Sequence, residues 1–349
     1  MCPPFSAASR AWFAILLVTL LASTTRSQDA PAGSTSTPTD PAALMLVAAK
    51  LNTLTAGDLK PWHLKATYQT FDEKGNVADE GTLEESWVAP DKFKRTYSGK
   101  VYTQTDFGTG SGVLRSGQRD DVSHLLLDLR RDLVDPLPDA QALGIGPFTE
   151  KQVDSGGSSL RCLTLAKPAG TPTYCLAADQ PMLRNMLRIT SWPGDGTHVL
   201  RNRMVSFHDH YLASDLSVVR AGKTILSAHL ASIETLDPVN DADLSPTSDA
   251  IALPRRIHIS AGVAQGLLER KVAPEYPSDA RAQRAQGTIV LQALIGTDGR
   301  VKDLRAISGP PVLQKSAIDA VSRWRYRPYL LSGSPVEVMT TINVIISVG

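Results

Sequence analysis

Apolar residues alternate with more polar ones from Trp62 onward, as Trp62, Leu64 and Ala66 show. A period of two is typical of a half-buried strand. Turn residues such as Gly75 separate one apolar segment from the next. We predict strands at about 62–70, 79–89, 92–98, 100–107 and 111–117, and further strand-like segments from about 160 to 236. The pattern therefore predicts an antiparallel meander.

Two segments follow a helical spacing instead. The first covers 41–54, with Asp40 as its N-cap, and the second covers 120–134. Their apolar faces consist of Leu44, Val47 and Leu51 in the first, and Val122, Leu125, Leu126, Leu129 and Leu133 in the second. We therefore predict an α+β fold, in which residues 41–236 form a curved antiparallel β-sheet, or half-barrel, with helices on one face.

The composition changes at 237–255, which is acidic and contains several prolines, as a linker between domains does. Residues 256–349 then predict a second domain. A short helix is expected at 279–285, two strands at 288–295 and 301–308, a helix opened by Pro310-Pro311, and a last strand at 336–348. The pair Asp298-Gly299 lies between the first two strands and is a strong hairpin signal, so we expect it to form the turn that joins them.

The N-terminus predicts export. Arg10 precedes one apolar run over 11–22, and small polar residues follow it, which is the pattern of a secretory signal peptide. The run has about a dozen residues, whereas a membrane span needs about twenty. We predict a signal peptide at 1–27 and a disordered leader at 28–40, and retention of the signal as a membrane anchor is the alternative.

Charge and cysteine content narrow the expected environment and partners. The chain has 36 Lys and Arg against 35 Asp and Glu, so its net charge of +1 gives no reason to expect a nucleic-acid partner. Loss of Cys2 with the signal leaves Cys162 and Cys175, on either side of a turn-rich loop. In an oxidising compartment this pair is expected to form a disulfide, with two buried free thiols as the alternative.

Several motifs of residues 257–349 closely resemble the TonB C-terminal domain family. They are Tyr276-Pro277, Asp298-Gly299, Ser308-Gly309 and the helix end Trp324-Arg325-Tyr326-Arg327-Pro328. The resemblance implies a three-stranded antiparallel sheet with two helices, a periplasmic location, and an outer-membrane TonB-dependent receptor or a similar envelope protein as partner. It also implies binding by strand addition at the last strand.

The residues that would contact this partner follow from the resemblance. They are Val336, Val338, Thr340, Ile342 and Val344 or their alternate neighbours, with Tyr276 and Pro277 as a second contact. The alternative for the aliphatic residues is a place in the core, and Trp324 is expected there. Exchange of strands into a homodimer is a further alternative for this edge.

The chain also departs from a complete TonB protein. Its apolar run contains no His to contact motor proteins, and a predicted globular domain stands where TonB has a Pro-rich rod. The resemblance therefore supports an adaptor in energy-coupled transport more than direct transduction of the proton gradient.

The first domain resembles a second family. The stretch from Gly81 to Tyr97, with the corner Ala89-Pro90-Asp91-Lys92-Phe93, looks like the half-barrel of periplasmic lipoprotein carriers, the LolA and LolB family. This resemblance implies an apolar cavity for a lipid acyl chain, and a periplasmic lipid or lipoprotein carrier with a TonB-like docking module is the alternative function. A scaffold without ligand is the other interpretation of the same pattern.

Residue patterns for catalysis are weak. His208-Asp209-His210 could supply metal ligands only with a further partner such as His198, and no nucleophile or acid–base pair has the expected companions. We therefore expect no enzyme activity, no catalytic residue, no metal site and no cofactor.

Overall fold

The computed structural model describes residues 37–138, 147–155, 157–166, 172–188 and 196–347. The predicted signal peptide at 1–27 and most of the predicted leader, 28–36, lie outside the described residues. The same holds for most of the loop between the two cysteines, 167–171.

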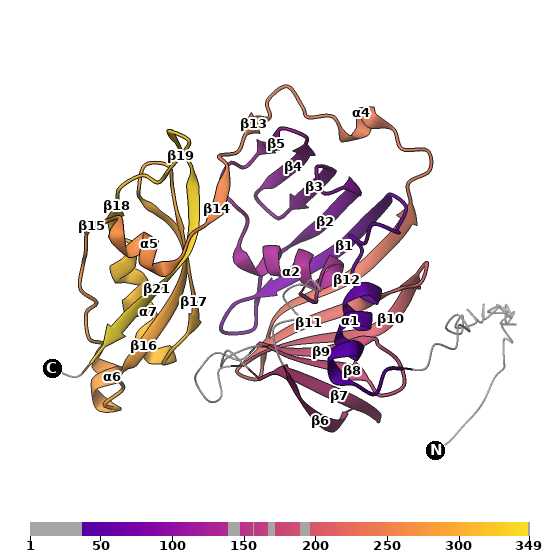
Figure 1. Cartoon of the computed structure of the whole chain (residues 1–349), viewed down its shortest axis with the longest axis horizontal. Coiled ribbons are helices and arrows are strands. Elements are labelled where there is room, and N and C mark those ends of the chain that lie inside the picture. Colours follow the sequence, from indigo (N-terminus) through magenta and orange to yellow (C-terminus); the bar gives the residue numbers. More distant parts are fainter. Residues whose placement is uncertain (1–36, 139–146, 156, 167–171, 189–195, 348–349) are drawn as a thin grey trace, which may run out of the picture. The chain divides into compact units, whose positions relative to one another are not determined.

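A large curved sheet forms the first domain (Figure 1). The predicted meander is present as β1 (Trp62–Phe71), β2 (Val77–Ala89), β3 (Lys92–Ser98), β4 (Thr103–Thr109) and β5 (Gly112–Gly117). The sheet continues through β6 (Phe148–Ser155), β7 (Ser158–Leu165), β8 (Thr173–Ala177), β9 (Leu183–Arg188), β10 (Thr197–Phe207), β11 (His210–Arg220) and β12 (Lys223–Thr235). Strand β1 pairs with both β2 and β12, so strands β1 to β5 and strands β6 to β12 form one antiparallel sheet.

Two helices, α1 (Pro41–Leu51) and α2 (His124–Val134), pack against one face of this sheet (Figure 1). Asp40 caps α1 as predicted, its carboxylate accepting a hydrogen bond from the backbone N–H of Ala43 at 2.8 Å. The buried face of α1 differs from the prediction, since Leu44, Met45 and Ala48 are buried whereas Val47 is 37% exposed. The predicted fold class is confirmed for this domain.

A buried carboxylate holds α2 on the sheet. Glu85 of β2 is fully buried and accepts hydrogen bonds from Arg130 of α2 at 3.0 Å and from Arg95 of β3 at 2.7 Å. Burial by itself raises the pKa of Glu85, but the two guanidinium groups outweigh it and lower the pKa from 4.5 to about 2. Arg130 also bonds Asp135, which closes a network across the end of α2.

The predicted disulfide is present between Cys162 of β7 and Cys175 of β8. The two residues are direct partners across the strand pair, and both are buried. The predicted disulfide is therefore confirmed.

The predicted linker follows the first sheet for part of its length. It contains the short helix α4 (Asp241–Leu244) and the two-residue strand β13 (Ile251–Ala252), which pairs with β5. Lys92 of β3 forms an ion pair with Asp241 at 2.7 Å. The chain leaves the first sheet after β13.

The C-terminal module has its own core. Its elements are β14 (Arg256–His258), α5 (Ala261–Gly266), β15 (Leu268–Arg270), α6 (Ser278–Ala282), β16 (Gly287–Ile295), β17 (Val301–Ser308), α7 (Pro311–Val321), β18 (Arg325–Tyr326), β19 (Leu330–Leu331), β20 (Ser334–Pro335) and β21 (Glu337–Ile346). The three expected strands, β16, β17 and β21, are antiparallel neighbours. The sheet has a fourth strand that the sequence analysis did not predict, because β14 pairs in parallel with β21.

Gly299 explains the turn between β16 and β17. Its φ is +76°, a conformation that side chains with a Cβ disfavour, and an added Cβ would lie 1.8 Å from the carbonyl oxygen of Tyr326. Both the turn and the close approach of β18 therefore require glycine at this position.

We predict that Glu85→Gln lowers the free energy of unfolding by about 3–5 kcal/mol, since it removes the buried charge that both guanidinium groups bond, leaving Arg95 without its ion-pair partner and Arg130 with Asp135 alone. Because the pKa of Glu85 is lower in the folded chain, its contribution is complete above pH 4.5 and is lost as the pH falls toward 2. Urea titrations over this range should show a steeper loss for the wild type than for the variant. The control is Glu84→Gln, whose side chain is 44% exposed; an equal loss in the control would contradict the role of Glu85.

We also predict that Cys162→Ala together with Cys175→Ala lowers the free energy of unfolding by roughly 3 kcal/mol, because the unfolded chain is then no longer constrained by the closed loop. Thermal unfolding with and without a reductant measures this. A reductant should destabilise the wild type and leave the double variant unchanged, and equal stability of both proteins without reductant would refute the prediction.

Candidate functional site: the free edge of the C-terminal sheet

The last strand, β21, has two different faces. The side chains of Val336, Val338, Thr340, Ile342 and Val344 are all buried, and the four aliphatic ones belong to the core of the C-terminal module. The alternate residues Thr341, Asn343 and Ile345 are exposed, and Ile345 is 75% exposed. Thus the structure buries all five named residues, and their alternate neighbours are the ones with exposed side chains.

The backbone of β21 shows which groups are free to bond. Glu337 donates its N–H to the carbonyl of Arg255, and Met339 accepts from the N–H of Ile259, so the odd-numbered residues point their backbone groups away from β16. In a strand this direction recurs at every second residue. The N–H and C=O groups of Thr341, Asn343 and Ile345 therefore point to the same outer edge.

On the side of β21 away from β16, no described strand pairs with it beyond Met339. Its outer neighbour β14 pairs only with Glu337, Val338 and Met339, and the other neighbour is β16. Unpaired backbone groups along a strand are a template for another strand. The outer row at Thr341, Asn343 and Ile345, which we call the free edge, is therefore the candidate site for the addition of another strand.

The side chains of the free edge contrast with those of two other outer strands. Strand β6 at one end of the large sheet carries Glu150 and Lys151, and β17 at the other end of the small sheet carries Lys302 and Asp303. Charged residues on an outer strand oppose pairing with other chains. The free edge has none, since its residues are Thr, Asn and Ile.

Tyr276 and Pro277, the predicted second contact, have structural roles. The hydroxyl of Tyr276 donates to the carbonyl of Ala285 at 2.6 Å, and its ring packs against the C-terminal core. Pro277 is the N-cap of α6, which begins at Ser278. Strand β16 follows α6, so the pair fixes the approach to the sheet.

Trp324 lies in the core, as expected. It is 4% exposed, and its indole N–H donates to the carbonyl of Val272 at 2.8 Å. The hydrogen bond satisfies the one polar atom of a buried indole.

The concave face of the large sheet is filled by side chains. Trp62, Leu64 and Leu83 are fully buried in one cluster with residues of α1 and α2. The indole of Trp62 donates to the carbonyl of Leu54 at 2.7 Å, which ties the strand to the segment after α1. An acyl chain on this face would need space that the helices now occupy.

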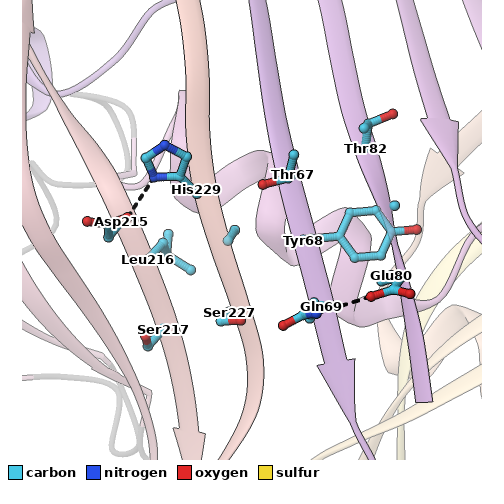
Figure 2. A pocket seen from close by; sticks show the side chains of 12 residues that line it. Thr67, Tyr68, Gln69, Glu80, Thr82, Asp215, Leu216, Ser217, Ser227 and His229 are labelled. Atoms are coloured by element: carbon cyan, nitrogen blue, oxygen red, sulfur yellow. Dashed lines mark hydrogen bonds and ion pairs between the residues drawn. The ribbon is translucent and has the colours of Figure 1, made fainter. Parts of the chain in front are cut away.

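A shallow pocket of about 620 Å³ lies over β1, β2, β11 and β12, and Figure 2 shows its lining. Thr67 and Gln69 line it and alternate along β1 with the buried Ala66 and Tyr68, so most of the lining belongs to the face opposite the helices. His229 and Asp215 are 2.7 Å apart there. Hydrogen bonds from Arg203 and His229 lower the pKa of Asp215.

The polar side chains of this pocket are not joined to each other as a nucleophile and base would be. Ser217 and Ser227 also line it, but no hydrogen bond joins His229 to either serine, so a nucleophile and base are not in contact. Within the described residues no group of three metal-ligating side chains comes together. His210 instead bonds the backbone carbonyl of Thr53 at 2.6 Å, and His208 contacts Thr235.

Residues 272–345 match the family model described as Gram-negative bacterial TonB protein C-terminal. The matched residues run from the segment before α6 to the end of β21, and so contain the free edge. The resemblance inferred from the sequence motifs is confirmed for this module. Among the described residues, no helix has the length and apolar character needed to cross a membrane.

Curated relatives that carry the name Protein TonB match the same module. The one from Vibrio cholerae is 32% identical over 72 residues, which is 20% of this chain and 30% of the relative. The one from Escherichia coli is 33% identical over 73 residues, again 20% of this chain and 30% of the relative. The chain therefore matches about a third of each relative's length.

Solved structures are similar to each part of the chain. A Pseudomonas aeruginosa TonB C-terminal domain is 24% identical, with a TM-score of 0.21 over 23% of this chain and 84% of that one. A LolA superfamily protein from Nitrosomonas europaea is 8% identical, with a TM-score of 0.36 over 59% of this chain and 97% of that one. Scores this low carry no function from one protein to the other.

Proposed function

We propose that the chain is a periplasmic adaptor whose C-terminal module binds outer-membrane receptors, or similar envelope proteins, by β-strand addition in support of energy-coupled transport. The free edge is the observation that carries the proposal. It combines outward backbone groups, exposed uncharged side chains and, on the side away from β16, no described strand paired beyond Met339. An extended segment of a partner would complete the hydrogen bonds of this row.

The comparisons support the same partner class. The matched family and the relatives named Protein TonB concern the module that contains the free edge. Because the match covers only about 30% of each of these two relatives, receptor binding by the present chain is a proposal rather than a transfer of their activity. Export by residues 1–27 belongs to the same proposal.

The carrier alternative has less support. The concave face that would receive an acyl chain is packed against α1 and α2, and the ion pairs between Glu85 and Arg130 hold α2 there. An acyl chain could enter only with movement of these helices. Association of two copies through their free edges is a competing use of the same site, and it predicts a dimer by sedimentation.

The direct experiment is a titration of the full chain with labelled peptides copied from the extended segments of TonB-dependent receptors. The proposal predicts saturable binding, measured by fluorescence anisotropy, and protection of backbone amides on β21 from hydrogen exchange. Saturable binding with protection elsewhere, or no binding of any receptor peptide to the folded chain, would refute it.

We predict that Asn343→Pro lowers the affinity for such a peptide by about tenfold or more, because proline removes an outward N–H and its ring obstructs the incoming strand. The ladder to β16 keeps its bonds, since the N–H of residue 343 does not point toward β16. The matched control is Asn343→Ala, which changes the side chain and keeps the N–H. Loss of binding in both variants would place recognition in the side chain instead of the backbone.

A further inference from the structure

Strand β14 occupies the beginning of the same edge. It runs parallel to β21, with Arg256 opposite Glu337, Ile257 opposite Val338 and His258 opposite Met339. Beyond the ladder itself, two hydrogen bonds of 3.0 Å, made by Arg255 and Ile259 on either side of β14, extend the pairing with β21. The chain's own segment therefore covers the first third of the edge, and the free edge is its continuation.

The side chains of this segment alternate between two environments. Ile257 and Ile259 pack against the core of the C-terminal module, while His258 is exposed to solvent. Arg256 lies on the same side as Glu337 and forms an ion pair with it, Nη2 to Oε2, at 2.9 Å. From residue 256 to residue 259 the segment therefore has a basic residue, an aliphatic residue, a solvent-exposed residue and a second aliphatic residue.

Glu337 requires a basic residue at the position of Arg256 on the neighbouring strand. Its side chain is only 3% exposed, and its second partner is Lys302 of β17, at 2.8 Å. A buried carboxylate is unfavourable without charged partners, and a carboxylate placed opposite it would be repelled. Any strand that covers this part of the edge must therefore present a cation opposite Glu337.

The structure also indicates that β14 can be replaced. The strand has three residues, and Arg256 and His258 are exposed although they lie within the sheet. Its aliphatic residues are half-buried, whereas the residues of β21 that they face, Val338 and Thr340, are buried. A longer strand that covered the whole row from Glu337 to Ile345 would make more backbone hydrogen bonds than β14 makes.

Given the strand-addition function proposed above, on which this inference rests, we propose that β14 is an internal occupant which the partner displaces. The displacing segment carries a basic residue opposite Glu337 and aliphatic residues opposite Val338 and Thr340, in parallel register. The partner is thus an extended peptide with the pattern basic, aliphatic, any residue, aliphatic.

The probe is a labelled synthetic peptide with the sequence of residues 254–260, Pro-Arg-Arg-Ile-His-Ile-Ser. It is titrated into the full chain and into the variant Ile257→Asp, in which the carboxylate would have to be buried against the core. This variant releases β14 and leaves β21 unchanged. The peptide should bind the variant at least about tenfold more tightly than the wild type, which holds its own copy.

Two controls define the pattern. His258→Asp introduces the same charge at an exposed position of the same strand and should leave the affinity at the wild-type value. A peptide with Glu in place of its second Arg should bind Ile257→Asp at least about tenfold more weakly than the original peptide. Circular dichroism establishes that each variant is folded, and Arg256→Glu, which repels Glu337, is the second variant if Ile257→Asp does not fold.

The inference is wrong if the released variant binds the peptide no better than the wild type, or if the two peptides bind it equally. Protection of the backbone amides of Glu337 and Met339 by the bound peptide would support it, and protection elsewhere would overturn it. The receptor proposal can fail separately: receptor peptides would then not bind any form, while the peptide of residues 254–260 still bound Ile257→Asp.

Discussion

The unpaired backbone of an outer strand is the constraint on which this account depends. Each N–H and C=O group along such a strand forms a hydrogen bond with water or with another strand. A group that is bonded only to water can exchange that water for a group of an incoming strand. The large sheet ends in the charged strand β6 on one side and the two-residue β13 on the other. At Thr341, Asn343 and Ile345 the backbone N–H and C=O groups point outward and the side chains are uncharged, so this edge lacks the charges that oppose pairing with another strand.

Buried charges determine what the first domain can do. Glu85 is bonded by Arg95 and Arg130, so these ion pairs hold α2 on the sheet together with its buried apolar residues, and they weaken when Glu85 is protonated. A helix held in this way keeps the concave face filled with Trp62, Leu64 and their neighbours. The described part of this face is therefore packed by side chains, and the outer row of free backbone groups on β21 lies in the C-terminal module.

Much of the fold could be predicted from periodicity and turn chemistry. The alternation of apolar and polar residues predicted β1 to β5, and Asp40 predicted the start of α1. The pair Asp298-Gly299 predicted the hairpin between β16 and β17. The alternation in β21 also indicated two faces, but it could not say which face the helices cover, so the named residues are those of the core. An alternating pattern shows that a strand has two faces, but tertiary packing decides which of the two is buried.

Strand β14 could not be predicted from the sequence. Three residues, Arg256 to His258, are too few for a periodic pattern, and their pairing with β21 joins positions about eighty residues apart in the chain. The buried Glu337 was missed for the same reason, because its partners Arg256 and Lys302 come from distant strands.

The most direct test is the hydrogen-exchange rate of individual backbone amides in the full chain, with and without a receptor peptide. The account predicts that in the free chain the amides of Thr341, Asn343 and Ile345 exchange much faster than those of Ile342 and Val344, which bond to β16. A bound peptide should slow the three fast amides selectively. Slow exchange of these three amides in the free chain, or no change on saturation with peptide, would contradict the claim that this edge is the partner-binding site.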